Sequence, residues 1–368
     1  MEFLRIKHVK ELWRAYGVYV LIFCLFLSLR IVAIQFKTSF FFDDTASLNV
    51  STPNNLYEDN SKIKYGWADL RFEDGKNYDV LAIKKVLFES KSDAKSILKD
   101  LTTLHKQTLD HQHPNLYYSI LRIWTSGMDY SDVNAIKWRG CSLNLIFFAL
   151  SFFFMFKLLN LINSDKNFIT LGLFFAFITT GTISNTLLIR SYPLMEAFFI
   201  FALYIYIVVS QAIEKNEKFS KRKLILYSVG LSVFFLTEYS SLFLGLLVLI
   251  SLLYKCISGR NITWLFRCLL IFGLSFLITI IFCPQYISNF LYMEHLKEAQ
   301  EASTLWNFVD FHRYGLYMIE FLSKYVFNCI GFYIILVGMF ALGLPVFRNK
   351  EFSENELKKL TPVIIITA

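Results

Sequence analysis

Apolar stretches of about 20 residues recur along the chain and predict a series of membrane-spanning helices. A helix of that length rises about 30 Å, which matches the hydrocarbon core of a bilayer. Polar segments with turn-forming or basic residues separate these stretches. The expected spans are residues 17–36, 140–160, 168–188, 192–213, 268–287 and 325–347, with a further helix starting at Leu360.

The apolar run 224–254 is too long for a single span. As one helix it would measure about 46 Å, far more than the hydrocarbon core requires. We therefore predict two short helices that meet near Glu238, which then lies at the tip of a hairpin. Together with the other stretches, this gives about nine spans, the last of them truncated.

Residues 114–128 have helical spacing of apolar positions but are too few to span a bilayer, and Arg122 lies among them. If this segment does not cross, all basic clusters fall on one side of the membrane, as the positive-inside rule requires. If it crosses, every cluster after the first moves to the other side. We therefore predict an interfacial or re-entrant helix and a cytoplasmic N-terminus. The clusters are residues 5–14, Lys157 with Lys166, 215–223, 255–267 and 348–359.

This topology makes residues 37–139 a large external loop, and residues 285–324 a second one. Within the first loop, residues 79–88 and 92–109 place apolar side chains at helical spacing with lysines off that face. They predict juxtamembrane helices lying on the membrane surface. Residues 49–79 between the first span and these helices are polar and turn-rich.

The composition excludes both a soluble globular chain and a disordered one. Of the 368 residues, 55% are hydrophobic and 18% are charged, whereas a soluble domain carries about 25% charged residues. The 37 Lys and Arg exceed the 29 Asp and Glu by 8, an excess that reports cytoplasmic loops rather than a nucleic-acid partner. The predicted fold class is an all-α polytopic membrane protein whose residues 1–368 form one transmembrane domain in a lipid bilayer.

The topology gathers rare polar residues at the outer ends of the helices. Ionisable groups at the membrane edge are expensive to hold there and are functional candidates for that reason. This convergence is the strongest functional signal in the sequence. The residues concerned are Asp43, Asp44, Asp110, His111, His113, Arg190, Tyr192, Glu238, Glu294 and His295.

Asp43 and Asp44 directly follow the first span. They are either interfacial acids that end a helix on the water side, or a catalytic base with a neighbour that orients it or binds metal. His111 and His113 precede a helix start, where they are either solvated loop histidines or ligands of a phosphate or a divalent cation.

Arg190 lies between two apolar runs. It either reaches to the lipid headgroups or clamps a phosphate through a bidentate contact. Glu238 is likewise either a polar residue at the tip of the hairpin or a functional carboxylate. Glu294 and His295 are adjacent, and neighbours on a helix point about 100° apart, so at most one of them is expected to bind a given metal ion.

Five segments in this order resemble the GT-C superfamily of glycosyltransferases that use polyprenyl-phosphate sugars. The resemblance is to the branch of protein O-mannosyltransferases and aminoarabinose transferases, glycosyltransferase family 39 and its bacterial relatives. The acidic motif after the first span is matched by FDDTAS, and the HPPLYY motif by DHQHPNLYYSILRIW. The Arg-x-Tyr stretch is matched by LLIRSYPLMEAFF, the Thr-His-Tyr stretch by FLTEYSSLFLG, and the Glu-His loop by FLYMEHLKEA.

The resemblance implies a membrane enzyme that moves a hexosyl or pentosyl group from a polyprenyl-phosphate donor to a lipid, glycan or protein acceptor, with inversion. The site would face outward from the cell inner (plasma) membrane, on the external or periplasmic side. Asp43 would be the general base and Asp44 its orienting or metal-binding neighbour. Arg190, His113 and Tyr192 would bind the donor phosphate. A divalent metal cation would be held by Asp44 with Glu294 or His295; further site candidates are Asp110, Tyr117 and Glu238.

The chain departs from the family pattern at several positions. Asp44 stands where Glu is usual, Asn115 replaces the second Pro of HPPLYY, and Glu238 replaces a His whose role cannot be transferred. The final segment LTPVIIITA begins a helix of only about 12 Å, so the family's C-terminal spans are expected to be missing.

Three other classes of membrane protein share the gross pattern. They are a transporter or lipid flippase, an O-antigen or capsule polymerase, and a structural membrane scaffold. Transporter sites lie near the midplane of the bilayer, whereas the polar residues here are expected at one face. The pattern therefore favours an enzyme of the outer face over a transporter.

Overall fold

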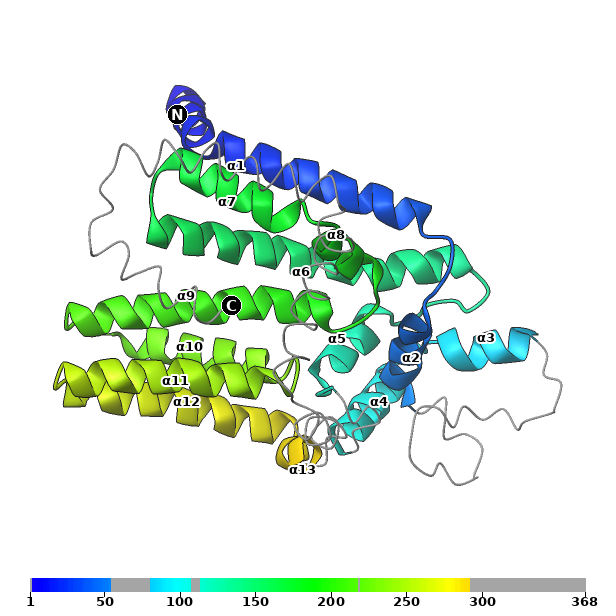
Figure 1. The fold of residues 1–368 in the computed structure, drawn as a ribbon. Coiled ribbons are helices and arrows are strands. Elements are labelled where there is room, and N and C mark those ends of the chain that lie inside the picture. The colour runs from blue at the N-terminus through cyan, green and yellow to red at the C-terminus, as the bar shows by residue number, and fades with distance from the viewer. Residues whose placement is uncertain (1, 54–79, 107–112, 218, 292–368) are drawn as a thin grey trace, which may run out of the picture.

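A computed structural model describes residues 2–53, 80–106, 113–217 and 219–291, and every regular element within these ranges is a helix. Most of the helices run side by side as a bundle (Figure 1). They are α1 (Glu2–Phe36), α6 (Val133–Ile162), α7 (Lys166–Phe177), α8 (Thr180–Leu187), α9 (Tyr192–Glu214), α10 (Lys221–Phe235), α11 (Ser241–Ser258) and α12 (Ile262–Phe282).

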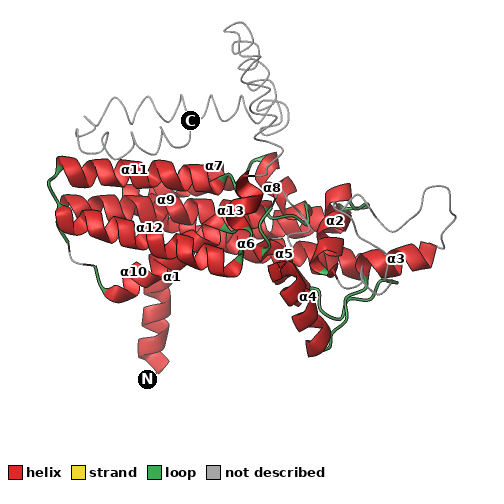
Figure 2. Cartoon of the chain, turned by 90° about the horizontal axis from the view of Figure 1, so that it is seen from below, coloured by secondary structure: helices red, strands yellow, loops and turns green. Residues whose placement is uncertain are grey.

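The other five described helices gather at one end of this bundle (Figures 1 and 2). Helix α2 packs against α3 and α5, α4 packs against α5, and α5 packs against α6 of the bundle. These five helices thus form a cap over the ends of the bundle helices. They are α2 (Phe42–Ser51), α3 (Val80–Phe88), α4 (Ala94–Lys106), α5 (Leu116–Trp124) and α13 (Tyr286–Leu291).

Five helices in the described ranges are long and apolar enough to cross a membrane: residues Ala15–Phe36 of α1, and α6, α9, α11 and α12. Helices α7 and α8 pass the same test together, with a bend of 54° between them, which brings the number to six. The chain is therefore a polytopic, all-helical membrane protein over its described part. The spans expected at 325–347 and from Leu360 lie outside the described residues, so the total of nine stays a prediction.

The division of the long apolar run is confirmed. Helix α10 ends at Phe235, α11 begins at Ser241, and Glu238 lies in the turn between them. The span expected at 268–287 is shifted, because α12 begins at Ile262 and ends at Phe282. Pro284 follows two residues later and has no amide hydrogen to continue the helix, so a separate short helix, α13, begins at Tyr286.

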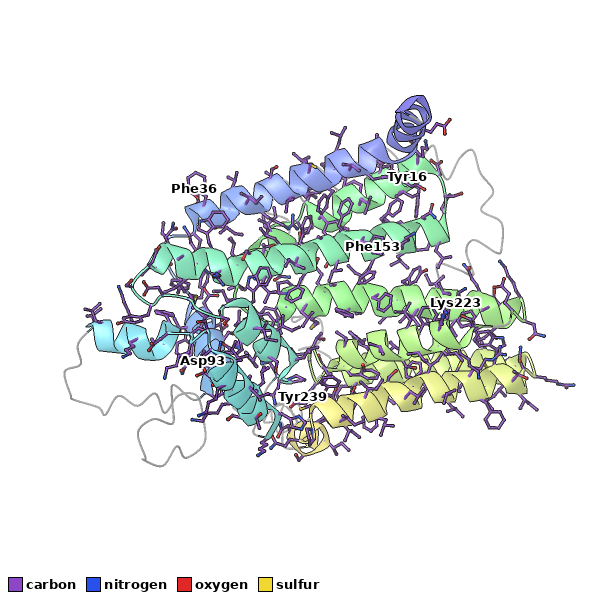
Figure 3. All side chains as sticks on the ribbon, turned by 180° about the vertical axis from the view of Figure 1, so that it is seen from behind. Tyr16, Phe36, Asp93, Phe153, Lys223 and Tyr239 are labelled. Carbon is purple, nitrogen blue, oxygen red and sulfur yellow. The ribbon has the colours of Figure 1, made fainter. Side chains whose placement is uncertain are left out.

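Large apolar side chains cover the outside of the bundle. Phe36, Tyr16 and Phe153 are among them and project from the ribbon in Figure 3. In water such a surface would drive association, whereas in a bilayer it contacts lipid tails. Other exposed members are Leu21, Val32, Leu226, Phe243, Leu247, Ile250, Phe266, Leu277 and Ile281.

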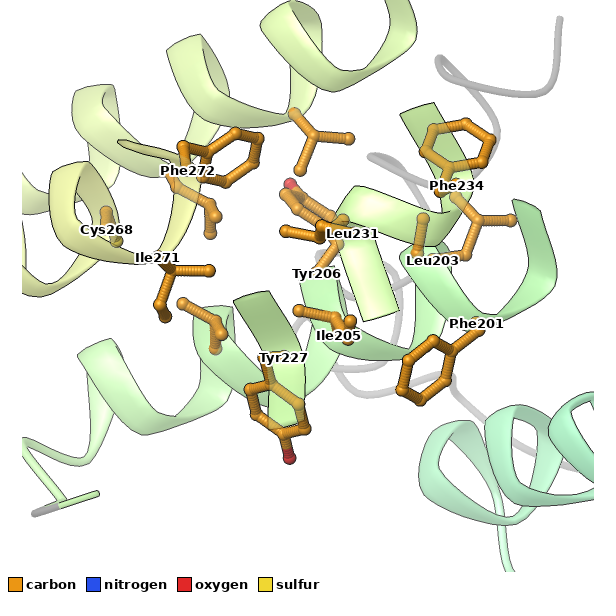
Figure 4. Close-up of a cluster of buried hydrophobic side chains, with 14 of the residues drawn as sticks. Phe201, Leu203, Ile205, Tyr206, Tyr227, Leu231, Phe234, Cys268, Ile271 and Phe272 are labelled. Carbon is orange, nitrogen blue, oxygen red and sulfur yellow. The ribbon is translucent and has the colours of Figure 1, made fainter. Parts of the chain in front are cut away.

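The interior of one half of the bundle is an apolar cluster from α9, α10 and α12 (Figure 4). Helices α9 and α10 approach closely because Gly230 faces Phe201. A Cβ atom at residue 230 would lie 2.0 Å from Cε1 of that ring. The ring cannot easily move, since it stacks on Phe154 with 4.5 Å between the ring centroids.

We expect Gly230→Ala to lower the free energy of unfolding by about 1–3 kcal/mol, the usual effect of overpacking a filled core. Thermal unfolding of the detergent-solubilised protein measures the change. Gly273→Ala is the matched control, because a Cβ atom at Gly273 would meet no atom within 4 Å. Equal stability of the two variants would contradict close packing of α9 on α10.

The helices predicted at 79–88 and 92–109 are present as α3 and α4, and residues 114–128 contain only the nine-residue α5, which is too short to cross. Arg122 of α5 is fully buried. Its Nε donates to Asp100 Oδ2 at 2.6 Å, Nη1 to Ser90 Oγ at 3.0 Å, and Nη2 to the Lys91 carbonyl at 2.8 Å. This arginine therefore joins α5 to α4 and to the segment before it.

Helix α2 is not predicted from the sequence, and its last residues, Asn49 to Ser51, were expected in a polar turn region. Two acidic residues in its first turn favour a helix start, because the N-terminus carries a partial positive charge. Asp44 also accepts a hydrogen bond from the Phe41 amide at 2.9 Å, which satisfies one of the amides that precede the helix. Such capping involves only neighbouring residues and produces no periodic pattern of apolar residues from which the helix could be predicted.

Candidate functional site

The polar residues singled out in the sequence meet at the capped end of the bundle. Helices α1, α8, α10 and α12 end there, and α6, α9 and α11 begin there (Figure 1). Figure 3 shows Asp93 and Tyr239 toward this end and Lys223 at the opposite one. The described basic residues of the loop clusters, such as Lys215, Lys255 and Arg267, belong to the opposite helix ends. The basic clusters that fall within the described residues therefore share the end of the bundle opposite the cap, and the cluster 348–359 lies outside those residues.

Asp44 is a fully buried carboxylate that ties three parts of the chain together. Its Oδ2 accepts from Lys37 Nζ at 2.5 Å, and its Oδ1 accepts from the Ile189 amide at 2.6 Å. Lys37 also donates to the Leu187 carbonyl at 2.6 Å. The end of α1 and the start of α2 are thereby fixed to the link between α8 and α9.

That link carries Arg190 and is held from a further side by α6. Asn144 of α6 donates through Nδ2 to the carbonyls of Thr186 and Leu188, at 3.1 Å and 2.6 Å. Backbone groups of a loop must be satisfied when they are buried, and here side chains of neighbouring helices do so. Arg190 is consequently presented from a rigid support rather than from a free loop.

Asp43 points away from this support and pairs with Arg190. Its Oδ1 lies 3.0 Å from Arg190 Nη2, and its side chain keeps 40% of its exposure while that of Arg190 keeps 8%. Arg190 Nη1 also donates to the Tyr118 hydroxyl at 3.3 Å. The site therefore contains an accessible carboxylate beside a buried guanidinium.

A second ionisable pair lies next to the first. His113 Nε2 is 3.3 Å from Glu238 Oε2, which brings the segment before α5 to the tip between α10 and α11. The His113 ring meets the ring of Tyr192 edge-on, with 6.4 Å between centroids. Tyr192 follows Arg190 by two residues, so it connects the two pairs.

Tyr117, a further expected site residue, lies buried close enough to Asp44 and Arg190 to feel their charges, whereas Tyr118 accepts the hydrogen bond from Arg190. Tyr117 is fully buried and packs against Phe147 in the apolar cluster under the cap. Burial raises the pKa of its phenol well above the usual range, so it is neutral at any physiological pH. Successive residues on a helix point about 100° apart, and the sequence does not say which tyrosine faces the site.

Several predicted site residues cannot be placed. Asp110 and His111, and the pair Glu294 and His295, lie outside the described residues. The described residues bring together Asp43, Asp44, Arg190, Tyr192, His113 and Glu238, as the sequence predicted. Sequence reasoning missed Lys37 and Tyr118, although Lys37 is a cation at the very end of the first span, where a nearby acid is an expected partner.

Comparisons with family models, with curated proteins and with solved structures found no match for this chain. The chemistry of the site therefore has to be argued from its own residues. It combines an accessible carboxylate, a buried guanidinium, an imidazole–carboxylate pair and two phenols at one end of a membrane bundle.

Proposed function

We propose that this protein is a membrane glycosyltransferase of the GT-C type, which transfers a sugar from a polyprenyl-phosphate donor to an acceptor hydroxyl at the outer face. The observation that carries the proposal is the Asp43–Arg190 pair at the capped end of the bundle, 3.0 Å apart, with the carboxylate accessible and the guanidinium buried. Such a pair offers a base for an acceptor and a cation for a phosphate within one site.

In the proposed reaction, Asp43 takes the proton of the acceptor hydroxyl as its oxygen attacks the anomeric carbon. The bond from that carbon to the phosphate oxygen breaks on the opposite face, which inverts the configuration. The polyprenyl phosphate leaves with the bonding electrons, and Arg190 stabilises the charge that develops on it. Asp44 does not react; it positions its neighbour by fixing the start of α2.

His113 and Glu238 would complete the donor site. The His113 imidazole, 3.3 Å from the Glu238 carboxylate, is positioned to donate a hydrogen bond to the leaving phosphate. Tyr192 supplies a ring and a hydroxyl between His113 and Arg190. A hydrogen bond to a charged group contributes about 1.5–3 kcal/mol. Loss of any one of these side chains should therefore lower the rate of sugar transfer measurably.

A divalent cation is part of the family resemblance, and Asp44 was one expected ligand. Both of its oxygens already accept hydrogen bonds, one of them from the Lys37 ammonium. A metal ion on this carboxylate would have to displace that cation, so Asp44 fits an orienting role better. Glu294 and His295 stay as predicted ligands outside the described residues, and no step above depends on a metal.

The proposed location is the cell inner (plasma) membrane, with the N-terminus in the cytoplasm and the site outside. The basic residues at the ends of α9 and α11 support this orientation, because cytoplasmic loops carry most of the lysine and arginine. The site residues sit at helix ends rather than at the middle of the bundle, which favours an enzyme over a transporter.

The test is sugar release from a radiolabelled polyprenyl-phosphate-sugar pool by membranes that contain the intact chain. Membranes without it are the control, and a third sample contains EDTA. We expect release that depends on the protein, with a product of inverted configuration. Loss of sugar release in EDTA would show that the reaction also requires a divalent metal cation. Well-inserted protein that releases no sugar from any of several hexosyl and pentosyl donors would overturn the proposal.

A further inference from the structure

A carboxylate with no role in the site described so far lies on α9, one helical turn after Tyr192. Glu196 is half-buried, within a helix apolar enough to cross the membrane. In the described part of the chain it accepts one long hydrogen bond, from Asn185 Nδ2 at 3.5 Å. A carboxylate at membrane depth is costly unless it is well paired, so this one requires an explanation.

On its inner side, Glu196 faces a small cavity of about 10 Å³ between α1, α6, α8 and α9. Arg30 lines the same cavity and is buried among apolar helices, with its guanidinium 3.9 Å from the centre of the Phe148 ring. Its Nε atom has no hydrogen-bond partner among the described residues. Arg30 thus supplies a positive charge behind Glu196 without forming a direct ion pair with it.

On its outer side, Glu196 lines an open pocket of about 450 Å³. Tyr192, Met195 and Phe199 line it from the same face of α9, at the spacing i, i+3 and i+7 that places side chains in one row. Asn185 of α8 closes the other side. The pocket joins the site above through Tyr192, whose ring meets His113.

The chemistry of this pocket fits a ring that carries hydroxyl groups. A carboxylate accepts hydrogen bonds at both oxygens, and an amide and a phenol each donate and accept. The aromatic rings offer apolar faces for the carbon–hydrogen side of such a ring. A phosphate and the Glu196 carboxylate are both acceptors and cannot hydrogen-bond to each other, and an ammonium group finds the carboxylate charge already offset by Arg30.

We propose that the Glu196 pocket binds the sugar ring of a lipid-linked substrate and thereby selects it. This assignment of the sugar to α9 rests on the proposed function, in which a lipid-linked sugar is a substrate. The ring comes either from the donor or from a glycolipid acceptor, and the two share the same hydroxyl chemistry. Glu196 is one helical turn, about 6 Å, from Tyr192, so a bound ring lies within reach of the Asp43–Arg190 pair.

The test measures binding separately from transfer. The full chain in phosphatidylcholine nanodiscs is titrated with photoreactive alkyl hexosides and pentosides, and crosslinks to α8 and α9 are quantified. An alkylphosphocholine of the same chain length is the ligand without sugar hydroxyls. We expect saturable crosslinking by at least one glycoside, and Glu196→Gln to weaken it by about tenfold or more, the effect of losing hydrogen bonds to a charged group.

Glu214→Gln is the matched control, because Glu214 lies at the far end of the same helix beside Lys255. Tyr192→Phe serves as the second variant if Glu196→Gln does not fold, and a smaller loss is expected there. Competition by the polyprenyl-phosphate sugar, and not by the bare polyprenyl phosphate, would assign the pocket to the donor sugar. Absence of that competition would assign it to the acceptor.

Two results would overturn the proposal that this pocket binds a sugar ring. They are equal crosslinking by the alkylphosphocholine, and unchanged glycoside binding in both Glu196→Gln and Tyr192→Phe. The proposed function fails in a different way, when the wild-type protein transfers no sugar although its glycoside binding depends on Glu196. Asp43→Asn should retain this binding, because Asp43 does not line the pocket.

Discussion

Replacing Asp43 with Asn is expected to slow sugar transfer by about 10²–10⁴-fold, the range over which general bases contribute. Asparagine keeps the size of the side chain and can still meet Arg190, but its amide cannot accept the proton of the acceptor hydroxyl. Insertion and folding should be unchanged, because the side chain is accessible and does not belong to the buried anchor. The measurement is initial rate with saturating donor, normalised to the inserted protein.

Asp129→Asn is the matched control for this variant. Asp129 is also an acid at the capped end, but its hydrogen bonds go to Ser131, two residues away. It should transfer sugar at the wild-type rate. A wild-type rate in Asp43→Asn would exclude Asp43 as the base and would leave Glu238 as the remaining described carboxylate next to an imidazole.

The largest effect on stability is expected from Asp100→Ala. The Arg122 and Asp100 side chains are 1% and 5% exposed, and their contact is 2.6 Å long. Removal of the acid leaves a buried guanidinium without its counter-charge, which costs about 3–5 kcal/mol in comparable buried pairs. Thermal unfolding in detergent should therefore show a marked loss, with α4 and α5 separating first.

The double variant Arg122→Met with Asp100→Leu should recover most of that loss, because replacing both members of a buried pair by apolar groups is often neutral. Glu214→Gln breaks a pair whose members are 28% and 58% exposed, and it should change stability by no more than about 1 kcal/mol. A double variant as unstable as Asp100→Ala would show that packing, and not the uncompensated charge, is responsible.

Hydropathy alone was enough to predict most of the described helices, because a span must satisfy its own backbone and must present apolar side chains to lipid. The division of α10 from α11 followed from length, since one helix would have overshot the bilayer. Helix α2 was not predictable in this way. It is short and partly polar, and it forms because the Asp44 carboxylate and the helices around it satisfy its first turn.

The sequence predicted that the described residues Asp43, Asp44, His113, Arg190, Tyr192 and Glu238 would lie at one end of the helices, but not what each of them contacts. The sequence places Asp43 and Asp44 side by side and cannot say which one faces the site. The structure separates them by their partners: Lys37 and the Ile189 amide hold Asp44 inside, and Arg190 meets Asp43 outside. Buried polar contacts such as Arg122 with Asp100 are equally invisible in a sequence, because they depend on where two helices cross.

The contacts of Asp44 also form in a fixed order while the chain is being synthesised. Lys37 precedes it by 7 residues, whereas Ile189 follows it by 145. At a synthesis rate of about 5–20 residues per second, the nascent chain waits roughly 7–30 s between the two contacts. During that interval Lys37 alone neutralises the Asp44 carboxylate. The end of the first helix and Asp44 therefore stay compatible with the membrane edge until the ribosome has synthesised the link between α8 and α9, which carries Arg190.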